Sequence, residues 1–310
     1  MSTAETAVRP AYRPYRVTVS AVERLSPHFV RVAFTDEELR HFGTAGLDQR
    51  IKLLFPRADG GFADFGPHDS PEAASWYDRW RALPDAERNP LRTYTVRRVD
   101  PARRELIVDF VVHGDAGPAG AWAEQAAPGR ELIIVGPDQR SPDSRLGLDW
   151  HPGTARRLLL AGDETAAPAI AGILESLDDG HDVDAFIEVP TEADALPIAC
   201  AERFRVAWLA RGDRPHGDVL VAAVQAWADS AEEVLSRAAA PRPQELADVD
   251  VDQELIWDSP DDADGEFYAW IAGEAAAIKT IRRMLVSGKG VDRKRVAFMG
   301  YWRDGQSERN

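Results

Sequence analysis

Residues 158–168 read LLLAGDETAAP, a sequence that predicts an apolar strand, a tight turn and the start of a helix. It is not the GxGxxG pattern of dinucleotide-binding turns. It does place Gly162 and the amides that follow at the carboxyl end of a strand, where α/β sheets bind nucleotides. Asp163 and Thr165 are equally common as simple helix caps, so the turn alone leaves a structural role open.

Strand-like and helix-like runs alternate along the second half of the chain. The expected strands are 157–161, 183–189, 204–209, 267–272 and 295–301, and the expected helices are 166–177, 218–228 and 274–286. This alternation is typical of a doubly wound α/β domain. The apolar residues of the last helix share one face, which leaves Lys279, Arg282 and Arg283 for the solvent side.

The first half has short β-rich runs separated by turn residues. The expected strands are 15–21, 29–35, 51–55, 93–99, 105–113 and 131–135, and their regular spacing predicts an antiparallel β-barrel. Between Phe55 and Leu91 the spacing of Trp76, Tyr77 and Trp80 predicts a short helix inside a loop. We therefore expect two domains, a barrel at 12–152 and an α/β domain at 153–310, the latter with an acidic insertion around 241–265.

Composition excludes several classes of function. The chain has 310 residues and a formal net charge of -15, which disfavours nucleic acid and acidic membranes as partners. No apolar run is long enough to span a bilayer, and the first residues do not form a secretory signal. Cys200 is the single cysteine, so the sequence predicts no disulfide and no cysteine-held metal, and we expect a reducing cytoplasm.

The segment Arg92-Thr93-Tyr94-Thr95 begins a predicted strand and combines a charge, a ring and two hydroxyls. Residues two apart share a face of a strand, so Arg92 and Tyr94 are expected on one side, with Thr93 and Thr95 on the other. A guanidinium suits a phosphate, and a tyrosine ring offers a stacking surface. One face of this strand can therefore hold a phosphate and a flat ring together.

A second strand, DFVVHG at 109–114, is followed by Gly117-Pro118-Ala119 and a helical stretch that contains Trp122. A glycine turn before a helix lets the backbone approach a phosphate, and the helix amides then face the anion. The alternative is a barrel hairpin capped by an ordinary helix, with Trp122 in the core.

Together with WIAGE at 270–274 and GYWRDG at 300–305, these segments resemble the siderophore-interacting protein family. Its members are flavin-dependent ferric-siderophore reductases of the ferredoxin-reductase-like superfamily. The resemblance runs from about Tyr15 to Arg303, and the combination of segments is specific whereas each alone is not. It implies an N-terminal FAD barrel and a C-terminal nicotinamide nucleotide domain.

The resemblance also implies roles for individual residues. Arg92 would pair with the FAD phosphates, and Tyr94 would pack on the flavin ring. Thr95, on the same face of the strand as Thr93, would lie near the reactive nitrogen of the flavin. The residues that would line the flavin are Asp109, Phe110, Val111 and His113, and those that would hold its diphosphate are Gly117, Pro118 and Ala119. The residues that would face the nicotinamide nucleotide are Gly162, Asp163, Thr165, Ala166, Gly273 and Glu274.

The electron donor is left open between NADPH and NADH. Glu188, at the end of the second α/β strand, would accept a ribose hydroxyl and favour NADH. Arg211 lies where relatives in the wider superfamily bind the 2′-phosphate, which favours NADPH and inclines the choice that way. Reduced ferredoxin is a further alternative.

Family members are thought to attract anionic ferric chelates with basic side chains near the flavin, and Lys52 and Arg303 occupy matching positions. Arg140 is a third candidate. A flavin suits this reaction because hydride carries two electrons and Fe(III) accepts one. Reduced iron is then held weakly by hard oxygen donors, so the reaction needs no metal site in the protein, and we expect none.

Two other readings remain at this point. A general flavin reductase or a ferredoxin/flavodoxin reductase would use the same cofactors with a different acceptor. A ferric-chelate binding protein would keep the fold without bound flavin. A yellow chromophore, which bound flavin gives, would distinguish a reductase from a ferric-chelate binding protein.

Overall fold

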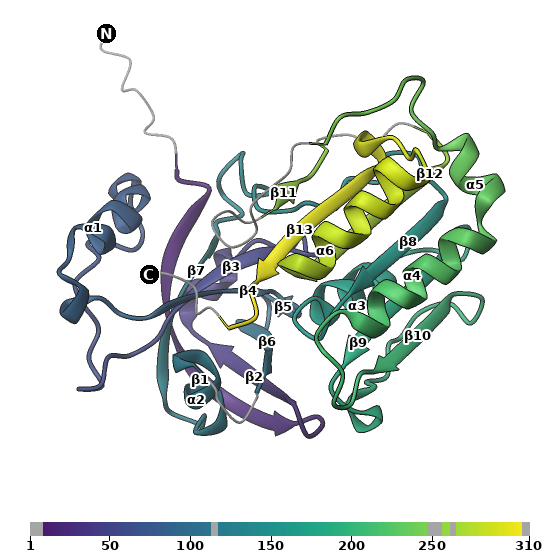
Figure 1. Ribbon diagram of the computed structural model, residues 1–310. Coiled ribbons are helices and arrows are strands. Elements are labelled where there is room, and N and C mark those ends of the chain that lie inside the picture. The colour runs from purple at the N-terminus through teal and green to yellow at the C-terminus, as the bar shows by residue number, and fades with distance from the viewer. Residues whose placement is uncertain (1–8, 113–116, 247–255, 261–264, 306–310) are drawn as a thin grey trace, which may run out of the picture. The chain divides into compact units, whose positions relative to one another are not determined.

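The computed structural model describes residues 9–112, 117–246, 256–260 and 265–305, and the chain forms two compact units (Figure 1). The first contains Phe29–Leu148 and the chain before Ser26, and the second contains Asp149–Arg309 with Ser26–His28. None of the helices in the described part of the chain is long and apolar enough to cross a membrane.

The first unit is built on one antiparallel sheet. Its strands are β1 (Tyr12–Arg24), β2 (Phe29–Thr35), β3 (Arg50–Leu54), β4 (Leu91–Thr95), β5 (Arg98–Asp100), β6 (Glu105–Val111) and β7 (Glu131–Pro137), in the order β4-β3-β7-β1-β2-β6-β5. β4 and β6 lie far apart in this order, yet the rings of Tyr94 and Phe110 are 4.7 Å apart. The sheet therefore curls into a partly closed barrel, which confirms the predicted architecture.

The single strand expected at 93–99 is wrong, because the structure has two strands there. β4 pairs with β3 up to Thr95, whereas Arg98 pairs with Ile107 of β6. Between them the Arg97 amide already donates to the Ile107 carbonyl at 2.9 Å. The chain changes partner at 96–97, and this corner brings the two edges of the barrel together.

The barrel interior is filled by the inward residues of its strands and by one helix. Val17, Val32, Leu53 and Leu132 are completely buried. Helix α2 (Pro118–Glu124) adds Trp122, which packs in the core and is 5% exposed. Burying one large apolar side chain contributes roughly 1.5–3 kcal/mol, so this core is the main source of the unit's stability.

The loop between β3 and β4 contains η2 (Pro71–Ser75), α1 (Trp76–Ala82) and η3 (Asp85–Glu87), and a further short helix, η1 (Glu37–His41), follows β2. As predicted, α1 carries an apolar face, with Trp76 and Trp80 packed in one cluster with Leu54 and Val135. Buried Asn89 ties the loop together by bonding to the backbone of Phe55, Gly61 and Ala63.

The second unit has a six-stranded, mainly parallel sheet. Its strands are β8 (Arg157–Gly162), β9 (Asp182–Val189), β10 (Arg205–Ala210), β11 (Trp257–Asp258), β12 (Phe267–Glu274) and β13 (Val296–Trp302), in the order β10-β9-β8-β12-β13-β11. The chain runs outward from β8 to β10 and then returns to the other side of β8. The order thus reverses between β8 and β12, which is where open α/β sheets bind ligands.

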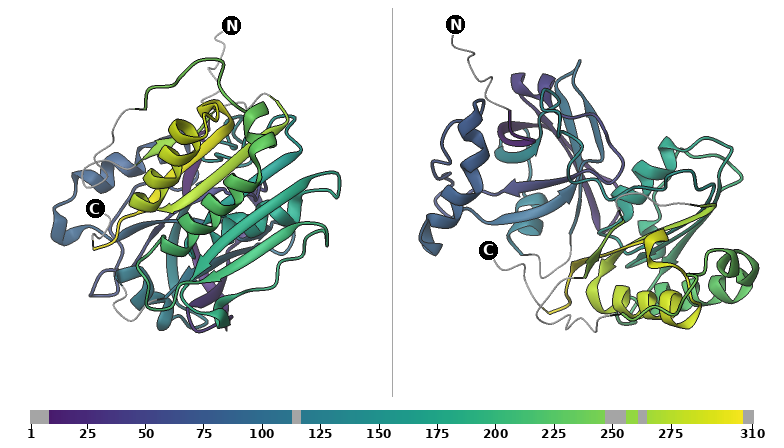
Figure 2. Two further views of the ribbon diagram at one scale, coloured as in Figure 1. Left: turned by 45° about the vertical axis from the view of Figure 1, so that its right-hand side comes forward. Right: turned by 90° about the horizontal axis from the view of Figure 1, so that it is seen from above.

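Helices cover both faces of this sheet. They are α3 (Ala167–Ser176), η4 (Glu192–Asp194), α4 (Asp218–Ser230), α5 (Glu232–Arg237), α6 (Ala275–Arg282), the π-helical turn η5 (Arg283–Gly288) and η6 (Arg293–Arg295). Figure 2 shows α3 on the face opposite to α4 and α6. This confirms the doubly wound prediction, although the helix expected at 274–286 changes to π geometry at Arg283.

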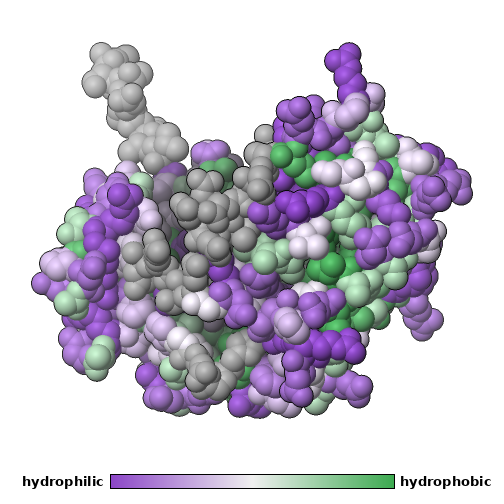
Figure 3. Space-filling view, viewed as in Figure 1, coloured by the Kyte–Doolittle hydropathy of each residue, from purple (hydrophilic) through white to green (hydrophobic). Residues whose placement is uncertain are grey.

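The solvent-side prediction for Arg282 is wrong, since its side chain is only 10% exposed and pairs with Asp258 at 3.1 Å. Asp258 belongs to β11, which comes from the acidic stretch and pairs antiparallel with β13. The sequence pattern of α6 did not reveal this extra edge strand. Around α4 and α6, Figure 3 shows hydrophobic side chains among hydrophilic ones.

Candidate functional site

The β3–β4 pair sets the directions of the side chains in the RTYT segment. Tyr94 pairs with Ile51, and Thr93 pairs with Lys52. Ile51 belongs to the barrel core and Tyr94 packs against that core, so Arg92 and Tyr94 lie on the core face. The opposite face carries Thr93 and Lys52, whose Nζ donates to Thr93 Oγ1 at 2.5 Å. The predicted alternation along this strand is confirmed.

Tyr94 begins a wall of three aromatic rings. Its half-buried ring lies 4.7 Å from Phe110, which lies 5.7 Å from Trp122 on α2. The indole Nε1 of Trp122 is buried and has no hydrogen-bond partner among the described residues. A buried donor left unpaired costs about 1–3 kcal/mol, and the described residues do not satisfy this one.

The turn before α2 leaves room beside this wall. A Cβ added to Gly117 would meet nothing within 4 Å, and Pro118 occupies the first helical turn. Ala119, within α2, is 7% exposed. Phe110 and Trp122 are buried and support the half-buried Tyr94 ring, and this ring together with the open backbone turn fits a flavin with its diphosphate. His113 lies outside the described residues.

Asp109 is engaged within the barrel. Its carboxylate receives two hydrogen bonds from Arg31, at 2.7 and 2.8 Å, and lies 3.6 Å from Arg97. It is 4% exposed, and Val111, two residues later, is half-buried. Asp109 thus holds two arginines at one end of β6, next to Phe110, and a direct contact with flavin stays a prediction.

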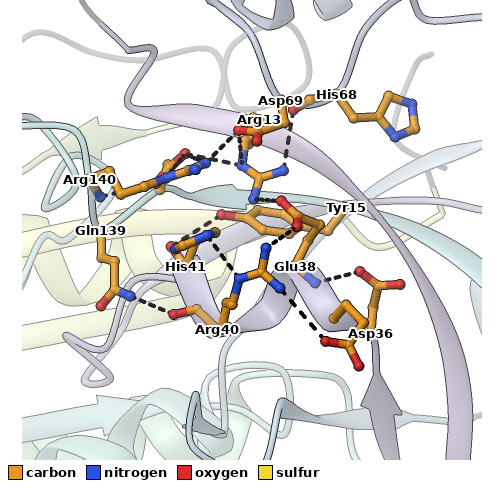
Figure 4. A network of polar contacts seen from close by, with 12 residues as sticks. Arg13, Tyr15, Asp36, Glu38, Arg40, His41, His68, Asp69, Gln139 and Arg140 are labelled. Carbon is orange, nitrogen blue, oxygen red and sulfur yellow. Dashed lines mark hydrogen bonds and ion pairs between the residues drawn. The ribbon is translucent and has the colours of Figure 1, made fainter.

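Arg140 belongs to a network of ion pairs with Asp138, Asp69 and Arg13 (Figure 4). Hydrogen bonds from Arg140 and Arg9 hold the pKa of Asp69 at about 2. Burial raises the pKa of Asp138, but hydrogen bonds from Arg140 outweigh it and leave that pKa below its ordinary value. Arg140 therefore has a structural role that the sequence did not reveal, and its contact with substrate stays a prediction.

In the second unit, Asp163 joins three strand ends. Its Oδ1 accepts from the amide and hydroxyl of Thr165, and its Oδ2 accepts from the Glu274 amide at 2.7 Å and the Trp302 indole at 2.8 Å. The side chain is 2% exposed. Asp163 therefore positions the turns after β8 and β12 and the end of β13. The contribution of Trp302 was not expected from the sequence.

Two glycines allow these turns to approach each other. A Cβ on Gly162 would lie 2.6 Å from the Ala272 carbonyl oxygen and 2.5 Å from the Cβ of Ala166. Gly273 has φ +151°, and a Cβ there would lie 2.6 Å from Asp163. Only glycine fits at both positions. The structure thus brings together the predicted residues of the β8 and β12 turns at the point where the strand order reverses.

Glu164 is a further charged residue at this edge that sequence reasoning missed. It is fully buried and makes a bidentate pair with Arg211, with both N–O distances at 2.9 Å. Burial and the neighbouring Asp163 carboxylate raise the pKa of Glu164 to about 7, and Arg211 opposes that rise. No local pattern could reveal the pair, because Glu164 and Arg211 lie in loops that follow two different strands.

Glu274 caps a helix, and its contact with the nicotinamide nucleotide stays a prediction. Its Oε2 accepts from the amides of Ala276 and Ala277, at 2.8 and 2.9 Å, at the start of α6.

The two basic residues predicted to attract the chelate belong to different units. Arg303 directly follows β13 in the second unit and is half-buried, whereas Lys52 lies in the first unit.

The partly closed antiparallel barrel followed by a doubly wound sheet is similar in fold to the ferredoxin reductase in carbazole 1,9a-dioxygenase, with a TM-score of 0.57 at 16% identity over 94% of this chain and 71% of that chain. Residues 18–141 match the model of the siderophore-interacting FAD-binding domain, and residues 155–305 match that of the siderophore-interacting protein. The chain belongs to the siderophore-interacting protein family.

Named relatives and a solved structure agree with this assignment. The chain is 28% identical to the ferric vibriobactin reductase of Vibrio cholerae, over 92% of this chain and 87% of the relative. It is 29% identical to the NADPH-dependent ferric-chelate reductase of Escherichia coli, over 95% of each. The crystal structure of a siderophore utilization protein from T. fusca has 28% identity and a TM-score of 0.70, over 97% of each chain.

Proposed function

We propose that this protein is an FAD-dependent reductase that uses a nicotinamide nucleotide to reduce the Fe(III) of a siderophore to Fe(II). The observation that carries the proposal is the aromatic wall of the barrel, where the half-buried Tyr94 ring, supported by buried Phe110 and Trp122, lies beside an open glycine turn. Relatives named as ferric-siderophore and ferric-chelate reductases support the same activity.

FAD supplies the chemistry that links a two-electron hydride donor to a one-electron acceptor. In this chain Tyr94 packs on the flavin ring and Arg92 binds the phosphates through its charged fork. The backbone amides that follow Pro118, in the first turn of α2, provide further donors to the cofactor. Thr95, which is 5% exposed, would lie near the reactive nitrogen of the flavin.

The nicotinamide nucleotide binds at the carboxyl edge of the second sheet, at the turns of Gly162 and Gly273. Here Asp163 accepts from the Thr165 and Glu274 amides, so the backbone of both turns is fixed before the nucleotide arrives. A preorganised turn loses little entropy on binding, which favours affinity. Reduced ferredoxin is the alternative electron donor. Reduction of the protein by NADH or NADPH alone would distinguish a nicotinamide nucleotide from ferredoxin as the donor.

The ferric chelate is the substrate, and its negative charge is attracted by Lys52 and Arg303. A local positive charge can concentrate an anion even on a protein whose net charge is -15. Fe(II) has less charge and binds hard oxygen donors more weakly, so reduction releases the iron. With one cysteine and no disulfide among the described residues, we place the protein in the cytoplasm.

Steady-state turnover tests this function. Purified protein with FAD and either nucleotide is given ferric catecholate or hydroxamate chelates with a ferrous trap, and in parallel flavodoxin or free flavin as acceptor. Faster turnover with the chelates is expected. Turnover confined to flavodoxin or free flavin would contradict the proposal in favour of a general reductase.

A further inference from the structure

Arg211 is fully engaged inside the second unit. Its Nη1 and Nη2 donate to the two carboxylate oxygens of Glu164, each at 2.9 Å, and Nη1 also lies 3.7 Å from Glu188. The Arg211 side chain is 8% exposed. A guanidinium binds a phosphate with the same paired donors that here hold Glu164, so a phosphate would have to displace a buried carboxylate.

Glu188 is also occupied. Its two oxygens accept from the amides of Gly217, at 2.8 Å, and Leu220, at 3.0 Å, and the side chain is fully buried. Glu188 thus caps the start of α4. It acts on a nucleotide through its charge and through the loop that it fixes, not as a direct acceptor from ribose.

The loop from Arg211 to Asp218 is compact. The Arg211 amide donates to Val189, and the Gly212 amide donates to Pro190, which ties the loop to the end of β9. Near its other end, His216 packs edge-on against Trp302, with ring centroids 4.8 Å apart. The loop therefore presents a fixed surface at the carboxyl ends of β9 and β10.

The charges at this edge are mostly negative. The carboxylates are Asp163, Glu164, Glu188, Asp213 and Asp218, and the guanidinium groups are Arg211 and Arg214. Arg214 is exposed and is flanked by exposed Asp213. A 2′-phosphate adds nearly two negative charges near neutral pH, and like charges within a few ångströms disfavour binding.

We propose that Glu164 determines donor specificity: by holding Arg211 it leaves this edge negatively charged, and the protein selects NADH over NADPH. This rests on the proposed function in one respect, that a nicotinamide nucleotide binds the second unit. The sequence suggested that Arg211 binds the 2′-phosphate. Under this proposal Arg211 instead positions the loop.

Direct binding tests the proposal without turnover. The full chain with its flavin is titrated calorimetrically at pH 8 with ADP-ribose and with 2′-phospho-ADP-ribose. ADP-ribose is expected to bind at least about tenfold more tightly, a difference of about 1.4 kcal/mol. Equal or tighter binding of the phosphorylated compound would overturn the proposal, and so would failure of both compounds to bind.

Three variants sharpen the test. Glu164→Gln removes the charge that holds Arg211 and is expected to reduce the preference for ADP-ribose by about tenfold. Glu192→Gln, at an exposed position after β9, is the matched control and should leave the preference unchanged. Arg211→Lys keeps the positive charge but not the paired donors, and it should weaken both compounds alike. Selective loss of 2′-phospho-ADP-ribose binding in Arg211→Lys would show that Arg211 binds the phosphate and would contradict the proposal.

Stopped-flow reduction of the bound flavin by NADH and NADPH gives a second readout with the same expected order. Reductase function is measured separately by photoreducing the flavin and adding a ferric chelate, a reaction that uses no nucleotide. Chelate reduction in that experiment together with a preference for NADPH would reject the specificity proposal and leave the reductase function standing.

Discussion

At the scale of single residues, the second unit depends on carboxylates whose roles are set by distant partners. Asp163 collects four hydrogen bonds from Thr165, Glu274 and Trp302. The sequence placed Asp163 at the correct sheet edge, because a glycine turn after an apolar strand is a local pattern. Its partners lie up to 139 positions away, so no local pattern could show that it serves three strand ends.

Replacing Asp163 by Asn keeps the shape of the side chain but should disturb the hydrogen bonds at this edge of the sheet. The new NH₂ group would face N–H or O–H donors, so at least one buried donor would lose its acceptor. We expect the free energy of unfolding to fall by about 3 kcal/mol and ADP-ribose affinity to fall at least about tenfold. Urea denaturation and calorimetry measure these effects, with exposed Asp179→Asn as control. Wild-type values in both would refute the positioning role.

Arg92→Ala should weaken retention of FAD, because the variant loses a charged donor to phosphate. We expect at least a tenfold higher Kd, corresponding to about 1.4 kcal/mol, measured by fluorescence after removal of the cofactor. Arg98→Ala, at a 64% exposed side chain on β5, is the control. An unchanged Kd for Arg92→Ala would remove this residue from the flavin site.

Lys52→Ala and Arg303→Ala should raise the apparent KM for anionic chelates without affecting flavin retention. Each removes a positive charge that we propose attracts the chelate, Lys52 from the first unit and Arg303 from the second, and the effect should weaken at high salt. Kinetics with an anionic and a neutral ferric chelate separate this effect from general damage. If the double variant has wild-type kinetics with the anionic chelate, electrostatic attraction by these residues is excluded.

At the scale of elements, strands with apolar alternation and helices with an apolar face were predictable, and points where an element changes partner were not. The expected strand 93–99 divides at 96–97, since the chain leaves β3 and joins β6. Arg282 lies on the predicted polar side of α6, but β11 covers that position with Asp258. Both differences arise from tertiary pairing, which outweighs local preference.

The β3–β4 loop provides a test at this scale. Asn89 is fully buried, and its side chain bonds to the backbone of Phe55, Gly61 and Ala63. Asn89→Ala removes the side-chain partner of the Phe55 carbonyl and the Ala63 amide, whereas the Gly61 carbonyl keeps the Arg57 amide, so we expect a loss of about 3 kcal/mol in unfolding free energy and faster proteolysis within 56–90. Exposed Gln125→Ala serves as control. Unchanged proteolysis would mean that the loop is held mainly by its tryptophans.

At the scale of the whole molecule, charge makes stability depend on pH in two opposite directions. The pKa of Asp138 is lowered in the folded state, so its contribution is complete above the unfolded pKa of about 4 and is lost as the pH falls further. The pKa of Glu164 is raised to about 7, so its contribution is lost as the pH rises toward and through that value.

Urea denaturation between pH 2 and pH 8 should therefore show a loss of stability below about pH 4 to which Asp138 contributes, and a loss toward pH 8 to which Glu164 contributes. Asp138→Asn should remove part of the acid-induced loss and lower stability at pH 6 by about 3 kcal/mol, because Arg13 and Arg140 lose a buried partner. Glu164→Gln should flatten the decline between pH 5 and pH 8. Profiles of the same shape in all three proteins would contradict the assignment of these groups.

The central claim is that bound flavin passes electrons from a nicotinamide nucleotide to a ferric siderophore, and an anaerobic spectral titration tests it most directly. NADH or NADPH is added to the purified protein, followed by a ferric chelate with a ferrous trap. We predict bleaching of the flavin band, then its return on addition of chelate together with trapped Fe(II). A colourless protein that does not take up FAD, or a reduced flavin that the chelate leaves bleached, would contradict the claim.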